Sequence, residues 1–331
     1  MINVAINGFG RIGRRVFRLL LNNPNIRVVA INDLADSKTL SHLLKYDSIH
    51  GVLSNTISFD DKHIIIDSYK VNIQNKKHPK SINWKPYNVD VVIEASGKFK
   101  TTEDLMHHIH NGASKVILSV PPTDDSINTI VLGVNDYIIN KKDVIVSNAS
   151  CTTNNAAPMI DIINNLCGIK QAYITTIHSY TTDQSLHDQP HRDLRRARAA
   201  GQSIVPTTTG AAKALTKIFP ELSDVIGGCG IRVPVANGSL TDITFNVKQN
   251  VTVNEVNNAF KEASKNKYKG ILEYTNDPIV SIDIVGNTHS CIFDSQMTSV
   301  IGNMVKIIGW YDNETGYSSR IIDLISKLEE I

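Results

Sequence analysis

The segment INVAINGFGRIGRRVFRLLLNNPNIRVVAIND, residues 2–33, decides the fold of the first half of the chain. It begins with an apolar run at residues 2–7 and continues with apolar residues at helical spacing. After Pro24 and Asn25 a second apolar, β-branched run follows at residues 26–33. A strand, a helix and a strand within about 32 residues have the length of a βαβ unit. The segment therefore predicts parallel strands joined by a helix, the start of an α/β domain.

Three glycines lie where the first strand meets the helix. Gly8, Gly10 and Gly13 have the spacing G-x-G-x-x-G, which lets the backbone turn tightly and approach a pyrophosphate at the helix N-terminus. Asp33 ends the second strand twenty residues after Gly13, where its carboxylate can accept hydrogen bonds from ribose hydroxyls and repel a 2′-phosphate. Each feature alone also occurs at ordinary turns. Together they predict a Rossmann dinucleotide-binding domain that prefers NAD to NADP.

Further strand and helix patterns extend this first domain to residue 150. Three apolar runs predict buried strands: 89–96, 114–120 and 143–150. EDLMHHIHNGA, residues 103–113, predicts a helix with a glycine near its end. Residues 49–85 instead alternate apolar and polar residues between turn signals, as antiparallel hairpins do. We expect a NAD-binding domain over residues 1–150 that contains an inserted antiparallel meander.

After residue 150 the pattern changes to long β-rich segments separated by helices. The expected strands include residues 172–180, 242–251, 279–286, 289–295 and 303–313, and NEVNNAFKEASKN, residues 254–266, predicts a helix. This order predicts an α+β catalytic domain over residues 151–313 with a mixed, mostly antiparallel sheet. Residues 314–331 predict an amphipathic helix whose apolar face consists of Ile321, Leu324, Ile325 and Leu328.

The composition excludes several classes of protein. Hydrophobic residues make up 41% and charged residues 20%, as in a soluble globular chain with a large core. Lys and Arg exceed Asp and Glu by only two, so any phosphate binding must be local. No signal peptide is recognisable, and no stretch approaches about 18 uninterrupted apolar residues. The four cysteines, Cys151, Cys167, Cys229 and Cys291, form no C-x-x-C pair, which argues against a metal site and suits a reducing cytoplasm.

A candidate nucleophile lies between a strand and a helix, in SNASCTTN at residues 147–154. Cys151 would lie at a helix N-terminus, where the helix dipole and free N–H groups stabilise a thiolate and an oxyanion. A lone cysteine is usually a buried structural residue, but its Ser, Thr and Asn neighbours form a polar surrounding. His178 ends an apolar strand beside hydroxyl residues, which makes it a candidate base rather than a core histidine. Whether the two side chains meet stays open at this level.

Five long motifs resemble the phosphorylating glyceraldehyde-3-phosphate dehydrogenases. They are NGFGRIGR, SNASCTTN, the segment from His178 to Ala214 with its TTTGAAKA loop, IRVPVANGS and WYDNETGYS, and the similarity extends from Ile2 to Leu328. The resemblance implies a glycolytic or gluconeogenic homotetramer. It also implies oxidation of glyceraldehyde 3-phosphate with NAD and inorganic phosphate to 1,3-bisphosphoglycerate, through a thioester.

The resemblance implies a role for each matched residue. Cys151 is the expected nucleophile and His178 the expected base. Contacts to substrate or phosphate are implied for Ser150, Thr152, Thr181, Arg196, Thr209, Gly210 and Arg232. Of these, Thr181 and Arg232 match the substrate-phosphate pocket, and Arg196, Thr209 and Gly210 the inorganic-phosphate pocket. NAD contacts are implied for Gly8, Gly10, Arg11, Ile12, Gly13, Asp33, Lys77, Ser119 and Asn313. The helix at 314–331 is expected to pack back on the NAD-binding domain.

Several positions depart from the usual pattern of that family. SVPPTDDS at residues 119–126 and ASGKF at residues 95–99 replace more common forms near the cofactor. Asn155 stands where many relatives have a second cysteine, so we expect Cys151 to oxidise differently. Gln189 replaces a frequent leucine before Pro190, which leaves some use of NADP open.

Two other functions compete with this interpretation. Residues 31–51 also resemble erythrose-4-phosphate dehydrogenase, which hydrolyses its thioester, but the intact TTTGAAKA loop favours a second phosphate site. A non-catalytic NAD- or RNA-binding protein on the same fold is the alternative from another class. The near-neutral charge and the lack of a basic strip with interleaved aromatic residues argue against RNA binding.

Overall fold

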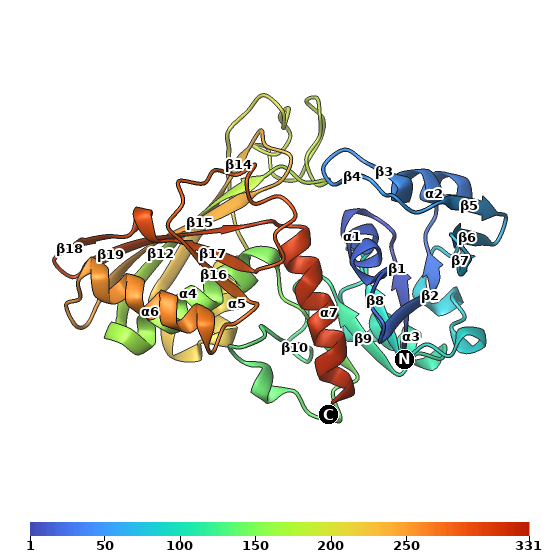
Figure 1. The fold of residues 1–331 in the computed structure, drawn as a ribbon, viewed down its shortest axis with the longest axis horizontal. Coiled ribbons are helices and arrows are strands. Elements are labelled where there is room, and N and C mark those ends of the chain that lie inside the picture. Colours follow the sequence, from blue (N-terminus) through green and yellow to red (C-terminus); the bar gives the residue numbers. More distant parts are fainter. Residues whose placement is uncertain (331) are drawn as a thin grey trace. The chain divides into compact units, whose positions relative to one another are not determined.

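The computed structural model describes residues 1–330, which form two compact units (Figure 1). The N-terminal unit consists of Met1–Ile130, Ile138–Ala149 and the chain from Ser318 onward. The C-terminal unit consists of Val131–Tyr137 and Ser150–Tyr317. Within residues 1–330 no helix is both long and apolar enough to span a membrane.

The N-terminal unit is built on a nine-stranded sheet with the order β10-β11-β9-β8-β1-β2-β7-β6-β5. Its strands are β1 (Ile2–Asn7), β2 (Ile26–Asn32), β5 (Ile57–Asp60), β6 (His63–Ile66), β7 (Tyr69–Gln74), β8 (Val91–Glu94), β9 (Lys115–Leu118), β10 (Asn128–Thr129) and β11 (Ile145–Ser147). All neighbours from β10 to β7 are parallel, whereas β5, β6 and β7 form an antiparallel meander. The Rossmann sheet and the inserted meander are therefore confirmed. A short hairpin, β3 (Tyr46–Asp47) with β4 (Gly51–Val52), lies outside this sheet.

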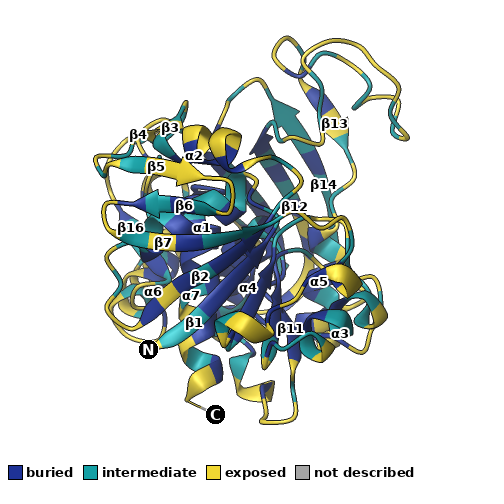
Figure 2. Ribbon diagram, turned by 90° about the vertical axis from the view of Figure 1, so that its right-hand side faces the viewer, coloured by how far each residue is buried: buried dark blue, intermediate teal, exposed yellow. Residues whose placement is uncertain are grey.

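The strand order predicts where this unit would bind a ligand. The chain proceeds from β1 to β2 on one side and later to β8 on the other. In open α/β sheets the crevice forms at the carboxyl ends of the strands where the order reverses, here at the ends of β1 and β8. The strands are buried because helices cover a parallel sheet on both faces, and β1 and β2 are largely dark blue in Figure 2.

The helices of the N-terminal unit match the apolar periodicity of the sequence. They are α1 (Arg11–Leu20), α2 (Ser37–Lys45), α3 (Thr102–His110) and most of α7 (Thr315–Glu329), with 3₁₀ turns η1 (Pro79–Ser81) and η2 (Lys85–Tyr87). Ile321, Leu324, Ile325 and Leu328 of α7 are all buried, which confirms the expected apolar face. The range expected for this helix ends at residue 331, which lies outside the described residues.

The C-terminal unit contains a mixed sheet with the order β13-β14-β12-β15-β19-β17-β16, and β18 pairs with β19. Its strands are β12 (Ile169–Ser179), β13 (Val205–Thr207), β14 (Ile226–Val233), β15 (Ser239–Val247), β16 (Leu272–Thr275), β17 (Cys291–Asp294), β18 (Ser299–Ile301) and β19 (Met304–Tyr311). Its helices are α4 (Cys151–Cys167), α5 (Ala211–Ile218) and α6 (Val253–Lys265), with 3₁₀ turns η3 (Asp136–Ile138), η4 (Pro220–Leu222) and η5 (Ser295–Met297). Only β12/β14 and β16/β17 are parallel pairs. The mixed, mostly antiparallel sheet is confirmed.

The strand expected at residues 279–286 is wrong. This apolar segment forms consecutive turns, in which the N–H of Asp283 donates to the carbonyl of Val280 at 3.0 Å. The carboxylate of Asp283 accepts from the N–H of Val280 at 2.8 Å, and Gly286 has a φ of +90°. Side-chain capping and a left-handed glycine favour turns over an extended chain. Val280 and Ile282 are exposed, so the apolar pattern here does not mark a buried strand.

Candidate active site

Cys151 is the first residue of helix α4. Ser150 is the N-cap, and its Oγ accepts a hydrogen bond from the N–H of Thr153 at 3.1 Å. The preceding Ala149 has a φ of +56°, in the left-handed region that favours glycine, so the chain turns under strain directly before the thiol. The fold therefore holds the Cys151 side chain at the positive end of a 17-residue helix.

The structure brings the two expected catalytic side chains together. His178 lies near the end of strand β12, and its Nε2 is 3.4 Å from the Sγ of Cys151. His178 is buried, and the parallel register of β12 and β14 pairs it with Arg232. A thiol within reach of an imidazole nitrogen is the arrangement of an activated nucleophile and its base.

Burial shifts the pKa values of both side chains in this pair. Burial raises the pKa of the Cys151 thiol, although the charge of Arg232 and the N–H of Thr152 oppose that increase. Burial and the charge of Arg232 lower the pKa of His178 to about 3. Removal from water disfavours each charged form. Burial therefore opposes the stabilisation that the helix N-terminus gives to a thiolate on Cys151.

Tyr311 lies beneath the pair, a residue that the sequence-based interpretation missed. Its hydroxyl is 2.9 Å from the Oγ1 of Thr152 and 2.9 Å from the Oγ1 of Thr176. Its ring meets the His178 ring edge-on, with centroids 5.9 Å apart and planes at 78°. The hydroxyl of Thr152 is therefore engaged by Tyr311. Its position within the WYDN motif, at the end of an apolar strand, was the available signal.

Arg232 is a partly buried cation at the same site. Among residues 1–330, no carboxylate forms an ion pair with it, and its Nη1 contacts only the His178 ring and the carbonyl of Ser179. A desolvated guanidinium without an acidic partner requires an anion, as a substrate phosphate would provide. Thr181, which we expected beside Arg232, follows in the next loop, and its carbonyl accepts from the N–H of Gln184 at 2.9 Å. In the described part of the chain no hydrogen bond joins Thr181 to Arg232.

Arg196 is held in a loop by polar contacts. Its Nη1 donates to the carboxylate of Asp183, and its Nε donates to the Oγ1 of Thr207 at 2.9 Å. Its Nη2 donates to the carbonyl of Thr208 at 3.3 Å. These contacts link a cation directly to the TTTG loop.

The TTTG loop leads into the N-terminus of helix α5. Gly210 is the N-cap and provides no side-chain cap, and the Oγ1 of Thr209 accepts from the N–H of Ala211 at 3.2 Å. The N–H groups at a helix N-terminus together with a nearby guanidinium favour anion binding. Arg196, Thr209 and Gly210 thus lie in one loop system, as expected for a second phosphate site.

The amide of Asn313 is oriented by two serine hydroxyls. Its Oδ1 accepts from the Oγ of Ser179 at 2.8 Å and from the Oγ of Ser239 at 3.0 Å. The Oγ of Ser239 in turn accepts from the N–H of Ser179 at 3.1 Å. Because the oxygen end is used, the Nδ2 end is the part of this buried side chain that can donate to a ligand.

The three glycines of the N-terminal unit differ in what surrounds them. A Cβ at Gly8, which has a φ of +94°, would lie 2.5 Å from the backbone nitrogen of Ser96, and one at Gly13 would lie 2.3 Å from the carbonyl oxygen of Gly8. A Cβ at Gly10 would meet no atom within 4 Å. Gly10 is also the N-cap of α1 and provides no side-chain cap. The residues therefore fit a dinucleotide, because Gly10 leaves open space for a pyrophosphate at a helix N-terminus.

Asp33 follows β2 and is tied to the glycine-rich loop. Its Oδ2 accepts from the N–H of Phe9 at 2.7 Å, and its Oδ1 accepts from the N–H of Ala35 at 3.0 Å. The amide of Asn75 donates to the carbonyl of Asp33 at 3.0 Å, which brings the segment with the exposed Lys77 beside it. A carboxylate has about four lone-pair sites, so Asp33 retains acceptors for ribose hydroxyls.

The other expected NAD contacts lie at the same edge of the sheet. The Arg11 guanidinium pairs with Asp47 at 2.7 Å, and Arg11 is the first residue of α1. Ile12 is half-buried in the first turn of α1. Ser119 follows β9, and its N–H donates to the carbonyl of Glu94 at 3.0 Å.

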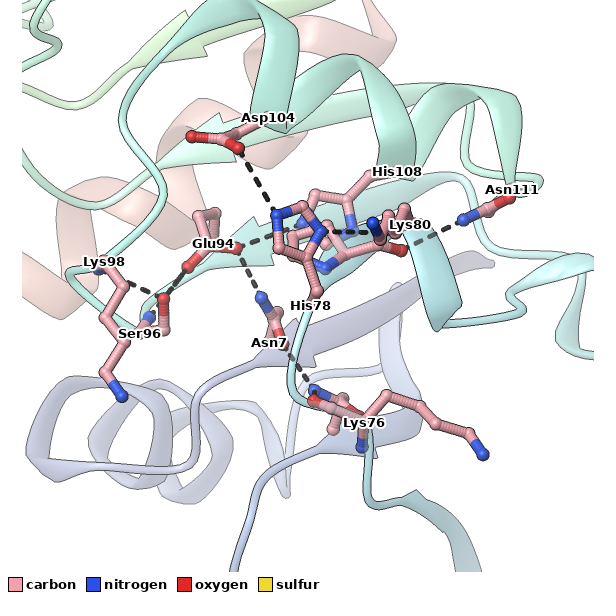
Figure 3. A network of polar contacts seen from close by, with 12 residues as sticks. Asn7, Lys76, His78, Lys80, Glu94, Ser96, Lys98, Asp104, His108 and Asn111 are labelled. Atoms are coloured by element: carbon pink, nitrogen blue, oxygen red, sulfur yellow. Dashed lines mark hydrogen bonds and ion pairs between the residues drawn. The ribbon is translucent and has the colours of Figure 1, made fainter.

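A buried polar network supports these strand ends, and no residue-level signal had identified it (Figure 3). Glu94, which is fully buried, accepts from the Nδ2 of Asn7, the Nε2 of His108 at 3.0 Å and the N–H of Ser96 at 2.9 Å. The hydroxyl of Ser96 is a fourth donor to this carboxylate. Asn32 donates to the Oδ1 of Asn7 at 2.8 Å. The network therefore connects the ends of β8, β1 and β2.

The donors of this network define the form of its histidine. The indole N–H of Trp84 donates to the Nδ1 of His108 at 3.0 Å, so the ring proton lies on Nε2 and points to Glu94. The Oδ1 of Asn32 accepts from the N–H of Lys76 at 2.8 Å. A hydrogen-bonded chain thus extends from α3 to the loop that precedes Lys77.

Two family models match this chain. Residues 2–102 match "Glyceraldehyde 3-phosphate dehydrogenase, NAD binding domain", and residues 150–313 match "Glyceraldehyde 3-phosphate dehydrogenase, C-terminal domain". Curated relatives are similar over the full length. Glyceraldehyde-3-phosphate dehydrogenase 2 of Streptomyces avermitilis is 51% identical over 326 residues, and glyceraldehyde-3-phosphate dehydrogenase 1 of Bacillus cereus is 49% identical over 327 residues. Each comparison covers 98% of this chain and 97% of the relative.

The chain belongs to the glyceraldehyde-3-phosphate dehydrogenase family. The enzyme from Geobacillus stearothermophilus is a further relative, 48% identical over 325 residues and 98% of this chain. In this chain, Asn155 is buried in α4, and its Nδ2 donates to the carbonyls of Ser290 at 3.3 Å and Trp310 at 3.2 Å. The amide thus has a structural role at a position where we had noted the absence of a cysteine.

The departing loop of this glyceraldehyde-3-phosphate dehydrogenase family member is anchored to a helix start. In residues 119–126, the carboxylate of Asp124 accepts from the N–H of Thr102 at 2.7 Å, and the hydroxyl of Ser126 donates to it at 2.6 Å. Thr102 is the first residue of α3. An acidic side chain over a helix N-terminus is favourable, so the loop has a defined anchor of its own. Gln189 is exposed.

Proposed function

We propose that this chain oxidises glyceraldehyde 3-phosphate to 1,3-bisphosphoglycerate with NAD and inorganic phosphate, in glycolysis or gluconeogenesis. Its membership of the family supports this reaction. The observation that carries the proposal is the Cys151–His178 contact of 3.4 Å beside Arg232, a partly buried cation with no carboxylate partner among residues 1–330. A nucleophile beside a cation of this kind suits an aldehyde substrate that carries a phosphate group.

The chemistry begins with addition of Cys151 to the aldehyde. The Sγ–carbon bond forms, the thiol proton moves to Nε2 of His178, and the carbonyl oxygen then takes that proton to give a hemithioacetal. N–H groups at the start of α4 are suited to stabilise the negative oxygen as it forms. The bound cofactor supplies the hydride acceptor. As hydride leaves the carbon, His178 Nε2 removes the hydroxyl proton, and the product is a thioester on Cys151.

The second half of the reaction releases the product. An oxygen of inorganic phosphate attacks the thioester carbonyl, the carbon–sulfur bond breaks, and the leaving thiolate takes the proton that Nε2 of His178 removed in the oxidation step. In this proposal Arg196, Thr209 and Gly210 hold the attacking phosphate, and Arg232 with Thr181 holds the substrate phosphate. Ser150 and Thr152 contribute through the backbone of the α4 N-terminus, because their hydroxyls already bind Thr153 and Tyr311.

In this proposal NAD is bound by the residues for which the family resemblance implies cofactor contacts. Gly8, Gly10, Arg11, Ile12 and Gly13 would hold the pyrophosphate, Asp33 the ribose, Lys77 the adenine side, and Ser119 and Asn313 the nicotinamide side. The oriented amide of Asn313 suits a carbonyl acceptor such as a carboxamide oxygen.

We also propose that the protein is a cytoplasmic homotetramer with a cofactor domain at 1–150 and a catalytic domain at 151–313, the final helix returning to the cofactor domain. Leu186, Leu194 and Ile204 are large exposed apolar side chains on the loop between β12 and β13, and much of this loop is drawn in yellow in Figure 2. Such exposed side chains support an interface with other copies of the chain. A mass measurement in solution that gives only monomers would contradict the tetramer.

The reaction is tested by NADH production from two aldehydes, with and without phosphate. We expect sustained turnover only when glyceraldehyde 3-phosphate and phosphate are both present, and none in Cys151→Ser. Sustained turnover of erythrose 4-phosphate without phosphate would identify a hydrolytic enzyme instead. Binding of NAD without any NADH production would support the non-catalytic alternative.

A further inference from the structure

Two serine hydroxyls fix the direction in which the Asn313 amide points. The Oγ of Ser239 accepts from the N–H of Ser179 at 3.1 Å, and its own proton goes to Asn313 Oδ1 at 3.0 Å. The hydroxyl of Ser179 donates to the same oxygen at 2.8 Å. A reversed amide would leave both buried hydroxyl protons without this acceptor, and residues 1–330 provide no other. We call Ser179, Ser239 and Asn313 the amide cradle.

The turn segment, residues 279–286, packs closely on the residue that precedes Ser239 in the cradle. A Cβ at Gly238 would lie 3.0 Å from the carbonyl carbon of Ser281 and would overlap its oxygen. Gly238 also has a φ of +88°, in the left-handed region that favours glycine. Glycine therefore lets the chain turn against the turn segment directly before the hydroxyl that orients the amide.

The same segment holds the residue that precedes Asn313. Gly286, at the end of the segment, donates its N–H to Asp312 Oδ2 at 2.7 Å. Asp312 Oδ1 accepts from the N–H groups of Glu314 and Thr315, each at 2.8 Å. This buried carboxylate thus joins the turn segment to the start of α7, and it fixes the backbone on both sides of Asn313.

The turn segment has internal support of its own. The N–H of Asp283 donates to the carbonyl of Val280 at 3.0 Å, and the Asp283 carboxylate accepts from the N–H of Val280 at 2.8 Å. Ile284 is buried, and its carbonyl accepts from the N–H of Asn287 at 3.0 Å. A segment with these contacts can hold the residues that it touches in a defined position.

We propose, on the basis of the function above, that the turn segment is a positioning element for the cofactor. It holds Ser239 and Asp312 so that Asn313 presents its Nδ2 to the nicotinamide. Because the cradle occupies the amide oxygen, Asn313 has only a donor to offer, and it selects the carbonyl oxygen of the carboxamide rather than the NH₂ group. The segment acts through the cradle, without a contact of its own to the cofactor.

Two glycine variants separate this role from backbone strain. Gly238 and Gly286 have φ values of +88° and +90°, so alanine imposes similar strain at either position. A Cβ at Gly286 would meet no atom within 4 Å, whereas one at Gly238 would displace the turn segment. We expect the Kd of NAD, measured by calorimetric titration, to rise roughly fivefold to tenfold in Gly238→Ala, about the value of one hydrogen bond, and less than about twofold in Gly286→Ala. Equal Kd values in the two variants would overturn the proposal.

A double-mutant cycle shows whether this effect passes through Asn313. Asn313→Ala alone should raise the Kd of NAD roughly tenfold, because the donor is lost. If the turn segment acts through the amide, addition of Gly238→Ala to Asn313→Ala should change the Kd by less than about twofold. An undiminished effect of Gly238→Ala in the Asn313→Ala background would overturn the proposal.

A cofactor analogue tests the direction of the amide in the wild-type enzyme, so that no variant needs to fold. 3-Acetylpyridine adenine dinucleotide keeps the carbonyl oxygen of the carboxamide and has a methyl group in place of NH₂. We expect its Kd to lie within about threefold of that of NAD, since the acceptor for Asn313 is retained. A Kd at least about tenfold higher would show that the NH₂ group is recognised, which would overturn the proposal.

NADH formation from glyceraldehyde 3-phosphate and phosphate is measured on the same wild-type preparation. If NADH forms while the binding results differ from those expected, the proposed function stands and the positioning role fails. If the binding results are as expected but no NADH forms, the positioning role stands and the proposed reaction fails.

Discussion

Substitution of Glu94 by Gln tests the buried network beneath the dinucleotide site. Each carboxylate oxygen accepts two donors: Oε1 from the N–H and hydroxyl of Ser96, and Oε2 from Asn7 and His108. In Glu94→Gln one oxygen becomes an amide NH₂, which faces either the donors of Asn7 and His108 or the N–H of Ser96, whose hydroxyl can turn to accept. Each hydrogen bond to a charged group contributes about 1.5–3 kcal/mol, and removal of a buried charge offsets part of the loss. We expect a net destabilisation of about 3 kcal/mol.

Glu273→Gln is the matched control. Glu273 also accepts from a histidine and an asparagine, His289 at 3.0 Å and Asn287 at 2.7 Å, but its side chain is 39% exposed. Solvent screening limits such a pair to about 1 kcal/mol or less. In a unit of this size about 1 kcal/mol changes Tm by roughly 2–4 °C, so calorimetry should show a decrease of roughly 6–12 °C for Glu94→Gln and at most about 4 °C for the control.

The same substitution should weaken NAD binding. Asn7 precedes Gly8 and Asn32 precedes Asp33, so loss of the Glu94 acceptor loosens both residues that line the dinucleotide site. We expect the Kd of NAD, measured by fluorescence titration, to rise roughly tenfold, since about 1.4 kcal/mol corresponds to a factor of ten. Equal Tm decreases in the two variants, or an unchanged Kd in Glu94→Gln, would refute the role assigned to this network.

Three further predictions follow from the site. Gly10→Ala should retain its Tm within about 2 °C but bind NAD at least about tenfold more weakly, because its Cβ meets no protein atom. Gly13→Ala should instead lower the free energy of unfolding by about 1–3 kcal/mol through overpacking, and equal Tm values in the two variants would contradict this difference. His178→Asn should slow the NADH burst by about 10²–10⁴-fold, measured by stopped flow, and a loss under about tenfold would exclude His178 as the base. Although burial opposes it, backbone N–H groups and the Arg11 guanidinium hold the pKa of Asp47 well below its usual range. The stabilisation that Asp47 provides is therefore present above its unfolded pKa of about 3.9 and decreases as pH falls further. In urea unfolding, the free energy of unfolding of Asp47→Asn should lie below that of wild type by a constant amount from about pH 8 to pH 5, and this difference should narrow below about pH 4. A difference that grows on acidification would contradict the prediction.

Local patterns predicted the parts of the fold that depend on neighbouring residues. The βαβ unit from Ile2 to Asn32 and the buried face of α7 follow from periodicity, because their apolar residues recur along the strands or over several helical turns. Residues 279–286 show the limit of this approach. Their apolar pattern resembles a strand, but the capping carboxylate of Asp283 favours turns.

The sequence indicated the candidate site residues better than it indicated the contacts between them. The polar surroundings of Cys151 indicated a nucleophile, but its distance to His178 depends on how β12 lies against α4. The Glu94 network was missed because its partners, Asn7 and His108, are 87 and 14 residues away and meet only in the folded sheet. The resting charge state of Cys151 also depends on burial, which helix position alone does not reveal.

The central claim is that Cys151 carries a thioester which only phosphate releases. The most direct measurement is the mass of the Cys151 peptide after the enzyme is mixed with NAD and glyceraldehyde 3-phosphate in the absence of phosphate. We expect one NADH per site, an acyl group on Cys151, and loss of that group with further NADH production when phosphate is added. An unmodified Cys151 during sustained NADH production, or an acyl group that phosphate does not remove, would contradict the account.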